Sequence, residues 1–263
     1  MRGAIAGDVI GAPYEWNRIK STDFPLFRSE SHWTDDTVLT VAVAEALLGD
    51  GDYRVALRSW GVRYPHAGYG GMFRRWLASP SRWSPAYNSF GNGSAMRVSA
   101  VGWLRHSTDA VLAEAAKGAE VTHNHPEGIK GAQAVALAIL RARTGTSKLD
   151  IRHELTDRFG YDLERRLEDI RPVYQFDETC QGSVPEALIA FFEADSWEAA
   201  VRNAVSLGGD ADTQACIAGS VAEAFFGGVP AEIWSEVEAR LPPDMRRLLG
   251  RFDTTVRAGP TQA

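Results

Sequence analysis

The chain has 263 residues and a formal net charge of −6, with 44% apolar and 24% charged residues. This composition is typical of a soluble globular protein with a real core, and the acidic balance argues against a dedicated nucleic-acid-binding surface, although a local basic groove stays open. The only two cysteines, Cys180 and Cys216, form no CxxC pair, which argues against a disulfide framework or a thiolate zinc site and favours a reducing, cytoplasmic location.

No stretch approaches the roughly 18 consecutive apolar residues of a membrane span. The apolar stretch at the N-terminus is short, and Asp8 and Glu15 interrupt it, so it is not a typical signal peptide. No membrane association is therefore expected.

Helical periodicity dominates the chain, and strand candidates are few. Alanine-rich segments with apolar residues at three- and four-residue spacing occupy 37–48, 109–121, 128–140, 184–194, 197–207 and 213–226. Ser147 with Asp150, and Ser183 with Glu186, have the spacing of capping boxes, which predicts helix starts at both serines.

No linker interrupts this pattern. The sequence predicts one compact all-α domain of many helices over residues 1–256, followed by a flexible tail at 257–263. Segments 20–31 and 80–93 are expected to be long loops, which are often functional. No oligomer interface is evident, and a monomer is expected.

Two aspartates stand side by side in WTDDTVLT at 33–40. One interpretation is purely structural: Thr34 caps a helix, and Asp35 and Asp36 in its first turn complement the helix dipole.

A second helix start repeats this construction, which favours a functional interpretation. GGDADTQACIAGS places Asp210, Asp212 and Thr213 ahead of another apolar helix. If the two starts face each other, their carboxylates repel unless cations neutralise them. Ligand sets of oxygen atoms alone favour hard ions such as Mg²⁺, Mn²⁺ or Ca²⁺, and two ions sharing the carboxylates would form a binuclear site.

An EF-hand does not fit the second segment. Counted from Asp210, Ala215 stands where the calcium loop requires glycine, and Val221 stands where it requires glutamate.

Three further segments are ambiguous on their own. The loop GNGS at 91–94 suits a phosphate cradle or an ordinary turn and cap. The histidines of THNH at 122–125 suit a metal pair or polar contacts. Tyr69, Gly70 and Gly71 either line a ligand cleft or pack a loop.

Taken together, these segments resemble the ADP-ribosylglycohydrolase family, which includes dinitrogenase reductase-activating glycohydrolase and the ADP-ribosylarginine and ADP-ribosylserine hydrolases. The match is in order and nearly full length, and the pairing of TDDT with GDADT is highly specific. The matching residues are Gly7-Asp8 with Gly11 and Glu15, Thr34-Asp35-Asp36-Thr37, Gly91-Asn92-Gly93-Ser94 with Met96-Arg97, Thr122-His123, and Gly209-Asp210-Ala211-Asp212-Thr213.

The resemblance implies an all-α domain with a binuclear cleft at helix N-termini that holds two divalent cations, Mg²⁺ or Mn²⁺. The implied metal ligands are Thr34, Asp35, Asp36, Asp210, Asp212 and Thr213. The implied substrate-binding residues are Gly91, Asn92, Gly93, Ser94 and Met96 around the diphosphate and distal ribose, and His123 near the adenosine end.

The activity implied by the resemblance is metal-dependent hydrolysis of the N- or O-glycosidic bond between C1 of ADP-ribose and a modified acceptor. Arginine is the default acceptor, and the substrate is an ADP-ribosylated protein or a small ADP-ribosyl compound; a nucleic-acid acceptor stays open. The implied catalytic residues are Asp35, Glu15 near the distal ribose, and Asp210, which takes a proton from water. Some relatives carry an acid just before the glycine-asparagine loop, whereas this chain has YNSF at 87–90, so a general acid must come from elsewhere.

Two other functions remain open at this point. One is a non-catalytic ADP-ribose-binding or structural homologue. The other is a two-metal nucleotide phosphohydrolase, in which the glycine loop would hold the phosphate under attack. Product identity separates the hydrolases, because only the glycohydrolase releases intact ADP-ribose.

Overall fold

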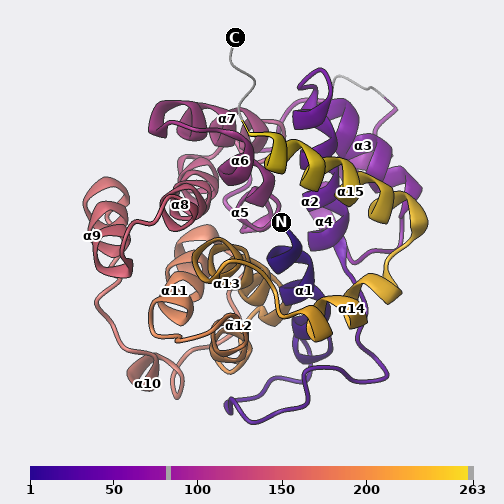
Figure 1. Cartoon of the computed structure of the whole chain (residues 1–263). Coiled ribbons are helices and arrows are strands. Elements are labelled where there is room, and N and C mark those ends of the chain that lie inside the picture. Colours follow the sequence, from indigo (N-terminus) through magenta and orange to yellow (C-terminus); the bar gives the residue numbers. More distant parts are fainter. Residues whose placement is uncertain (81–83, 260–263) are drawn as a thin grey trace.

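The computed structural model describes residues 1–80 and 84–259, and this part of the chain is helical without any strand (Figure 1). An isolated antiparallel β-bridge joins Gly91 to Thr179. The predicted all-α domain is therefore confirmed. The helices are α1 (Arg2–Gly11), η1 (Ala12–Tyr14, a 3₁₀ turn), α2 (Asp35–Leu48), α3 (Tyr53–Arg63), α4 (Gly71–Ala78), α5 (Gly93–Met96), α6 (Ser99–Leu104), α7 (Thr108–Glu120), α8 (Pro126–Arg143), α9 (Lys148–Phe159), α10 (Leu167–Ile170), α11 (Cys180–Phe192), α12 (Trp197–Val205), α13 (Ala211–Phe226), α14 (Ala231–Arg240) and α15 (Pro243–Ala258).

One of the two predicted capping boxes is confirmed and the other is wrong. Ser147 caps α9, because its hydroxyl accepts a hydrogen bond from the Asp150 N–H at 3.2 Å. The predicted start at Ser183 lies inside α11, which begins at Cys180 and is capped by Thr179. The Ser183 hydroxyl instead donates back to the Thr179 carbonyl at 2.6 Å, a bond that serines make within helices.

Helix α13 lies at the centre of the molecule (Figure 1). It packs against α1, α8, α11 and α12, and nearly all of its side chains are buried. Because it is surrounded, α13 has apolar or small residues along most of its length, and its acids Asp212 and Glu223 lie toward its two ends.

Helices α1 and α13 are in backbone contact because glycines stand where they meet. A Cβ atom on Gly7 would lie 2.1 Å from the Ala215 carbonyl oxygen, and one on Gly3 would lie 2.1 Å from that of Gly219. A Cβ atom on Gly11 would also collide with the first turn of α13. The close approach carries the end of α1 to the start of α13.

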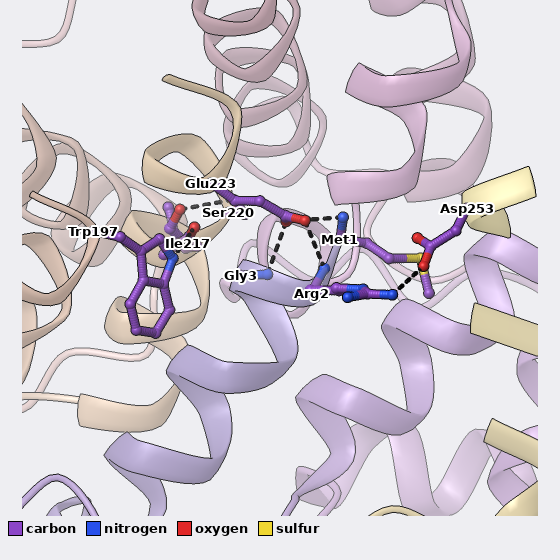
Figure 2. Close-up of polar contacts among 9 residues, drawn as sticks. Met1, Arg2, Gly3, Trp197, Ile217, Ser220, Glu223 and Asp253 are labelled. Atoms are coloured by element: carbon purple, nitrogen blue, oxygen red, sulfur yellow. Dashed lines mark hydrogen bonds and ion pairs between the residues drawn. The ribbon is translucent and has the colours of Figure 1, made fainter. Parts of the chain in front are cut away.

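A carboxylate of α13 fixes the first turn of α1, as Figure 2 shows. Glu223 accepts hydrogen bonds from the backbone N–H groups of Arg2 at 3.1 Å and Gly3 at 2.8 Å, and lies 2.9 Å from the Met1 amino group. An acid at this position satisfies free N–H groups and complements the helix dipole. The Arg2 guanidinium pairs with Asp253, so α15 is joined to the same point.

The last helix continues into the segment expected as a tail. α15 includes Arg257 and Ala258, and residues 260–263 lie outside the described part of the chain. Cys180 and Cys216 are free and buried. Among the described helices, none combines the length and apolar character needed to cross a membrane.

Candidate active site

The two acidic helix starts face each other across one cavity. Thr34 caps α2, and Asp210 is the capping residue of α13. The Thr213 hydroxyl of α13 donates to Asp36 Oδ1 of α2 at 3.3 Å, so the two starts are in direct contact. The cavity has a volume of about 400 Å³, and its walls include all the expected metal ligands: Thr34, Asp35, Asp36, Asp210, Asp212 and Thr213.

Glu15 brings a further carboxylate to this cluster from the end of the 3₁₀ turn η1. Carboxylate oxygens of Glu15, Asp210 and Asp212 all lie within 4.8 Å of one another. Three carboxylates this close together offer only oxygen ligands, which are the ligands that hard divalent cations prefer.

The electrostatics of the cluster also favour a bound cation. Burial and the neighbouring Asp212 raise the pKa of Glu15 to about 7, and burial raises the pKa of Asp210 to about 6. Burial and then like charges hold the pKa values of Asp35, Asp36 and Asp212 well above the ordinary range. Within the described residues, none of these acids forms an ion pair with lysine or arginine.

Asp36 supplies a specific test of metal fit. Its Oδ2 atom is buried and has no hydrogen-bond partner in the described part of the chain. A buried carboxylate oxygen without a partner is costly, and coordination to a cation would satisfy it. The residues present therefore fit a divalent metal.

Asp8 is an important residue to which the sequence analysis gave no role. It is fully buried in α1 and accepts hydrogen bonds from the N–H and hydroxyl of Thr34, at 2.9 and 2.7 Å, and from the N–H and hydroxyl of Thr37. Asp8 thereby locks the first turn of α2 onto α1. Its position in an otherwise apolar helix was the available signal, since buried acids are rare unless they are well bonded.

The glycine-asparagine loop contacts the acid cluster directly. The Asn92 side-chain amide donates to Asp210 Oδ2 at 2.8 Å and to the Ser183 hydroxyl at 3.1 Å. The Asn92 backbone N–H donates to the Glu178 carbonyl at 2.8 Å, beside the bridge from Gly91. Asn92 thus fixes the orientation of Asp210.

Most of the expected substrate-binding residues line the cavity, but two of them do not. The Ser94 hydroxyl donates to the Gly128 carbonyl at 2.7 Å inside the core. Tyr69 is buried against Phe73, with ring centroids 5.2 Å apart. The expected residues that do line the cavity are Gly70, Gly71, Gly91, Asn92, Gly93, Met96 and His123.

Several cavity residues were not found from the sequence. Trp16 and Phe176 stack at a centroid distance of 5.8 Å, although they are far apart in the chain. No local pattern links them, because they come from loops that meet only in the fold. The other residues of this kind include His32, His66, Tyr87 and Glu178.

Known proteins are similar to this chain in sequence and in fold. The chain is 28% identical to mouse ADP-ribosylhydrolase ARH3 over 86% of its own length and 82% of the relative. It is 27% identical to ADP-ribosylarginine hydrolase Tri1 of Pseudomonas putida (strain GB-1), over 90% of the chain and 72% of the relative. It is 26% identical to ADP-ribosyl-[dinitrogen reductase] glycohydrolase of Rhodospirillum rubrum, over 81% of the chain and 76% of the relative.

A solved structure described as an ADP-ribosylglycohydrolase-related protein complex superposes with a TM-score of 0.69 at 25% identity, covering 95% of this chain and 96% of that chain. The family model for ADP-ribosylglycohydrolase matches residues 1–258. The chain therefore belongs to the ADP-ribosylglycohydrolase family and is a hydrolase.

Proposed function

We propose that this protein uses two divalent cations, Mg²⁺ or Mn²⁺, to hydrolyse the glycosidic bond between C1 of ADP-ribose and a modified acceptor. The observation that carries this proposal is the convergence of two acidic helix starts and Glu15 on one cavity beside the glycine-asparagine loop. A binding protein would not need so many unneutralised acids in one place, because each is costly to bury.

The cations would be held by oxygen atoms from both helix starts: Thr34, Asp35, Asp36, Asp210, Asp212 and Thr213. A bound divalent cation supplies positive charge that offsets the crowded carboxylates and polarises ribose hydroxyl groups.

Different residues of the chain would carry out different parts of the hydrolysis. Asp210, oriented by Asn92, accepts a proton from the attacking water as the water oxygen bonds to C1. The bond from C1 to the acceptor breaks, and its electron pair leaves with the acceptor atom, which takes up a proton from solvent, while Asp210 returns its proton to solvent. Glu15 and Asp35 stabilise positive charge that develops on the ribose ring. The loop at Gly91 and Gly93 holds the diphosphate, and His123 lies toward the adenosine end.

The rim of the cavity favours arginine as the acceptor. Trp16 is 73% exposed at this rim and stacks on Phe176, and Glu15 and Glu178 line the same cavity. Aromatic faces and carboxylates together attract planar cations. A guanidinium already contacts one of these rings, since Arg18 Cζ lies 4.8 Å from the Phe176 centroid.

The test is a panel of proteins ADP-ribosylated on arginine or serine, incubated with the purified chain and Mg²⁺ or a chelator, with products identified by mass. We expect intact ADP-ribose from the arginine linkage with Mg²⁺ and none with the chelator. Asp35→Ala and Asp212→Ala should each reduce turnover at least about 10³-fold, whereas Asp195→Ala, at an exposed acid outside the cavity, should match the wild type.

Each alternative outcome has a distinct meaning. AMP or inorganic phosphate as the product would favour a phosphohydrolase. Tight binding of ADP-ribose without turnover on any linkage would favour a binding protein. Full activity of Asp212→Ala at low metal concentration would contradict the proposed ligand set.

A further inference from the structure

His123 lies against the glycine-asparagine loop. A Cβ atom on Gly93 would be 3.0 Å from His123 Nε2. The Tyr87 ring lies on another side of the imidazole, with centroids 5.9 Å apart. Gly93, Tyr87 and His123 all line the cavity, so the Nε2 edge of the ring faces the loop that would hold the ligand.

The opposite nitrogen of this ring meets a buried hydroxyl. Thr122 Oγ1 lies 2.7 Å from His123 Nδ1. Thr122 is fully buried and does not line the cavity. Thr122 can therefore influence a ligand only through the groups that it contacts.

A buried guanidinium lies behind this hydroxyl. Arg97 Nη2 donates to Thr122 Oγ1 at 2.9 Å and to the Gly118 carbonyl at 3.1 Å. The Thr122 oxygen therefore accepts from a cation, which polarises its O–H toward the next acceptor. Two further groups meet this hydroxyl, Nδ1 of His123 at 2.7 Å and the Tyr87 side chain. The Tyr87 phenol carries its own proton and can donate to the Thr122 oxygen, which leaves the Thr122 O–H for Nδ1 of His123.

Charge favours the same arrangement. Burial and the Arg97 guanidinium hold the pKa of His123 well below its ordinary value, so the ring is neutral and carries one N–H. A proton on Nδ1 of His123 would point toward Thr122 and the Arg97 guanidinium, where positive charge disfavours it. A proton on Nε2 points toward the glycine-asparagine loop.

We propose that Thr122 is a positioning residue: with Arg97 behind it, its hydroxyl fixes His123 in the tautomer protonated on Nε2 and so aims an N–H donor at the ligand oxygen that lies against Gly91 and Gly93. This inference rests on the proposed function for the identity of the ligand, a phosphate or ribose oxygen of ADP-ribose. It assigns a role to the threonine before the histidine, which touches no ligand itself.

The first measurement is the tautomer itself. Nitrogen NMR of the full chain labelled with ¹⁵N-histidine distinguishes protonated from unprotonated ring nitrogens, and His123→Gln identifies the His123 signals. Wild type and Thr122→Ser should show the proton on Nε2. Thr122→Val, which has nearly the same shape but no hydroxyl, should shift His123 to a mixture of tautomers.

The second measurement is the affinity for ADP-ribose, by calorimetry in the presence of Mg²⁺. Thr122→Val should weaken binding about tenfold, the usual effect of losing one aimed donor, while Thr122→Ser retains wild-type affinity. His123→Gln, whose amide N–H stands near the Nε2 position, should bind more tightly than His123→Ala. In hydrolysis assays, the valine variant should raise KM more than it lowers kcat, because the donor is remote from C1.

An unchanged tautomer in Thr122→Val would overturn this inference and leave the proposed function intact. Equal ADP-ribose affinity in the valine and serine variants would also overturn it. A wild-type chain that binds no ADP-ribose would overturn the proposed function instead. Thermal unfolding of each variant is the control for loss of the fold.

Discussion

At the scale of single residues, the buried acids of the site differ in how many hydrogen-bond partners their carboxylate oxygens have. Asp8 accepts hydrogen bonds from two threonines, whereas Asp36 leaves one buried oxygen without a partner in the described residues. The first acid therefore stabilises the fold, and the second has a free oxygen that suits the proposed cation.

Asp8→Asn should lower the free energy of unfolding by about 3 kcal/mol. Three of the four donors meet Oδ2 and one, the Thr34 hydroxyl, meets Oδ1. The amide can keep its oxygen at the Oδ2 position only by placing its NH₂ group against the Thr34 hydroxyl, and the remaining bonds lose the charge of the carboxylate. Urea unfolding followed by circular dichroism measures the change, and Asp195→Asn at the surface should stay within about 0.5 kcal/mol of wild type. Equal stability of the two variants would show that Asp8 does not hold the start of α2.

Asp36→Asn should do the opposite in a chelator: it should raise the free energy of unfolding by about 1 kcal/mol. The substitution removes a buried negative charge that other carboxylates repel, and the retained oxygen still accepts from Thr213. Hydrolysis should be lost at the same time. A lower unfolding midpoint for Asp36→Asn in the chelator would argue that the cluster is not electrostatically strained.

At the scale of helices, the contact between α1 and α13 sets the geometry of the site. Gly7→Ala should lower the free energy of unfolding by about 3 kcal/mol or more, because the new Cβ would meet backbone atoms of Ala215 that cannot move aside. Gly250→Ala is the matched control in α15, where nothing lies within 4 Å of a Cβ, and it should stabilise the chain by about 0.5–1 kcal/mol. Similar effects of the two substitutions on thermal unfolding would contradict the close contact.

Local sequence signals were sufficient to predict the two helix starts that matter most. Thr34 and its acidic first turn, and the glycines ahead of Asp210, are cues that act within a few residues. The same kind of signal is ambiguous at α11, because Thr179 and Ser183 can both cap a helix. Only the fold determines that Thr179 is the cap.

Tertiary contacts were beyond the reach of sequence patterns. The stacking of Trp16 on Phe176 depends on loops that meet in space. Asp8 belongs to a motif that the sequence shows, yet its role depends on threonines around the start of another helix. The sequence motif located the cavity wall at His123, but the path from Arg97 through Thr122 to that ring required the structure.

At the scale of the whole molecule, the candidate metal site joins segments from opposite ends of the chain. Asp35 and Asp212 are separated by most of the sequence, and both line one cavity. A cation that binds this cluster binds only the folded chain, so metal binding must stabilise the entire domain.

Mg²⁺ or Mn²⁺ at about 100 times its dissociation constant should therefore raise the free energy of unfolding by about 2.7 kcal/mol. Thermal unfolding at constant ionic strength, with K⁺ in place of the divalent ion, controls for screening of the net charge. Asp212→Asn should lose most of the metal-dependent increase. An identical increase in wild type and Asp212→Asn would show that the ion acts elsewhere.

The stacked aromatics at the rim have a consequence for how such proteins diversify. Trp16 and Phe176 belong to segments without helical structure, whereas the acids are fixed at the starts of helices. Residues in exposed loops change at little cost to folding. Under the proposed function, substitutions in these two non-helical segments would change which acceptor is released, while the acids at the helix starts stay the same.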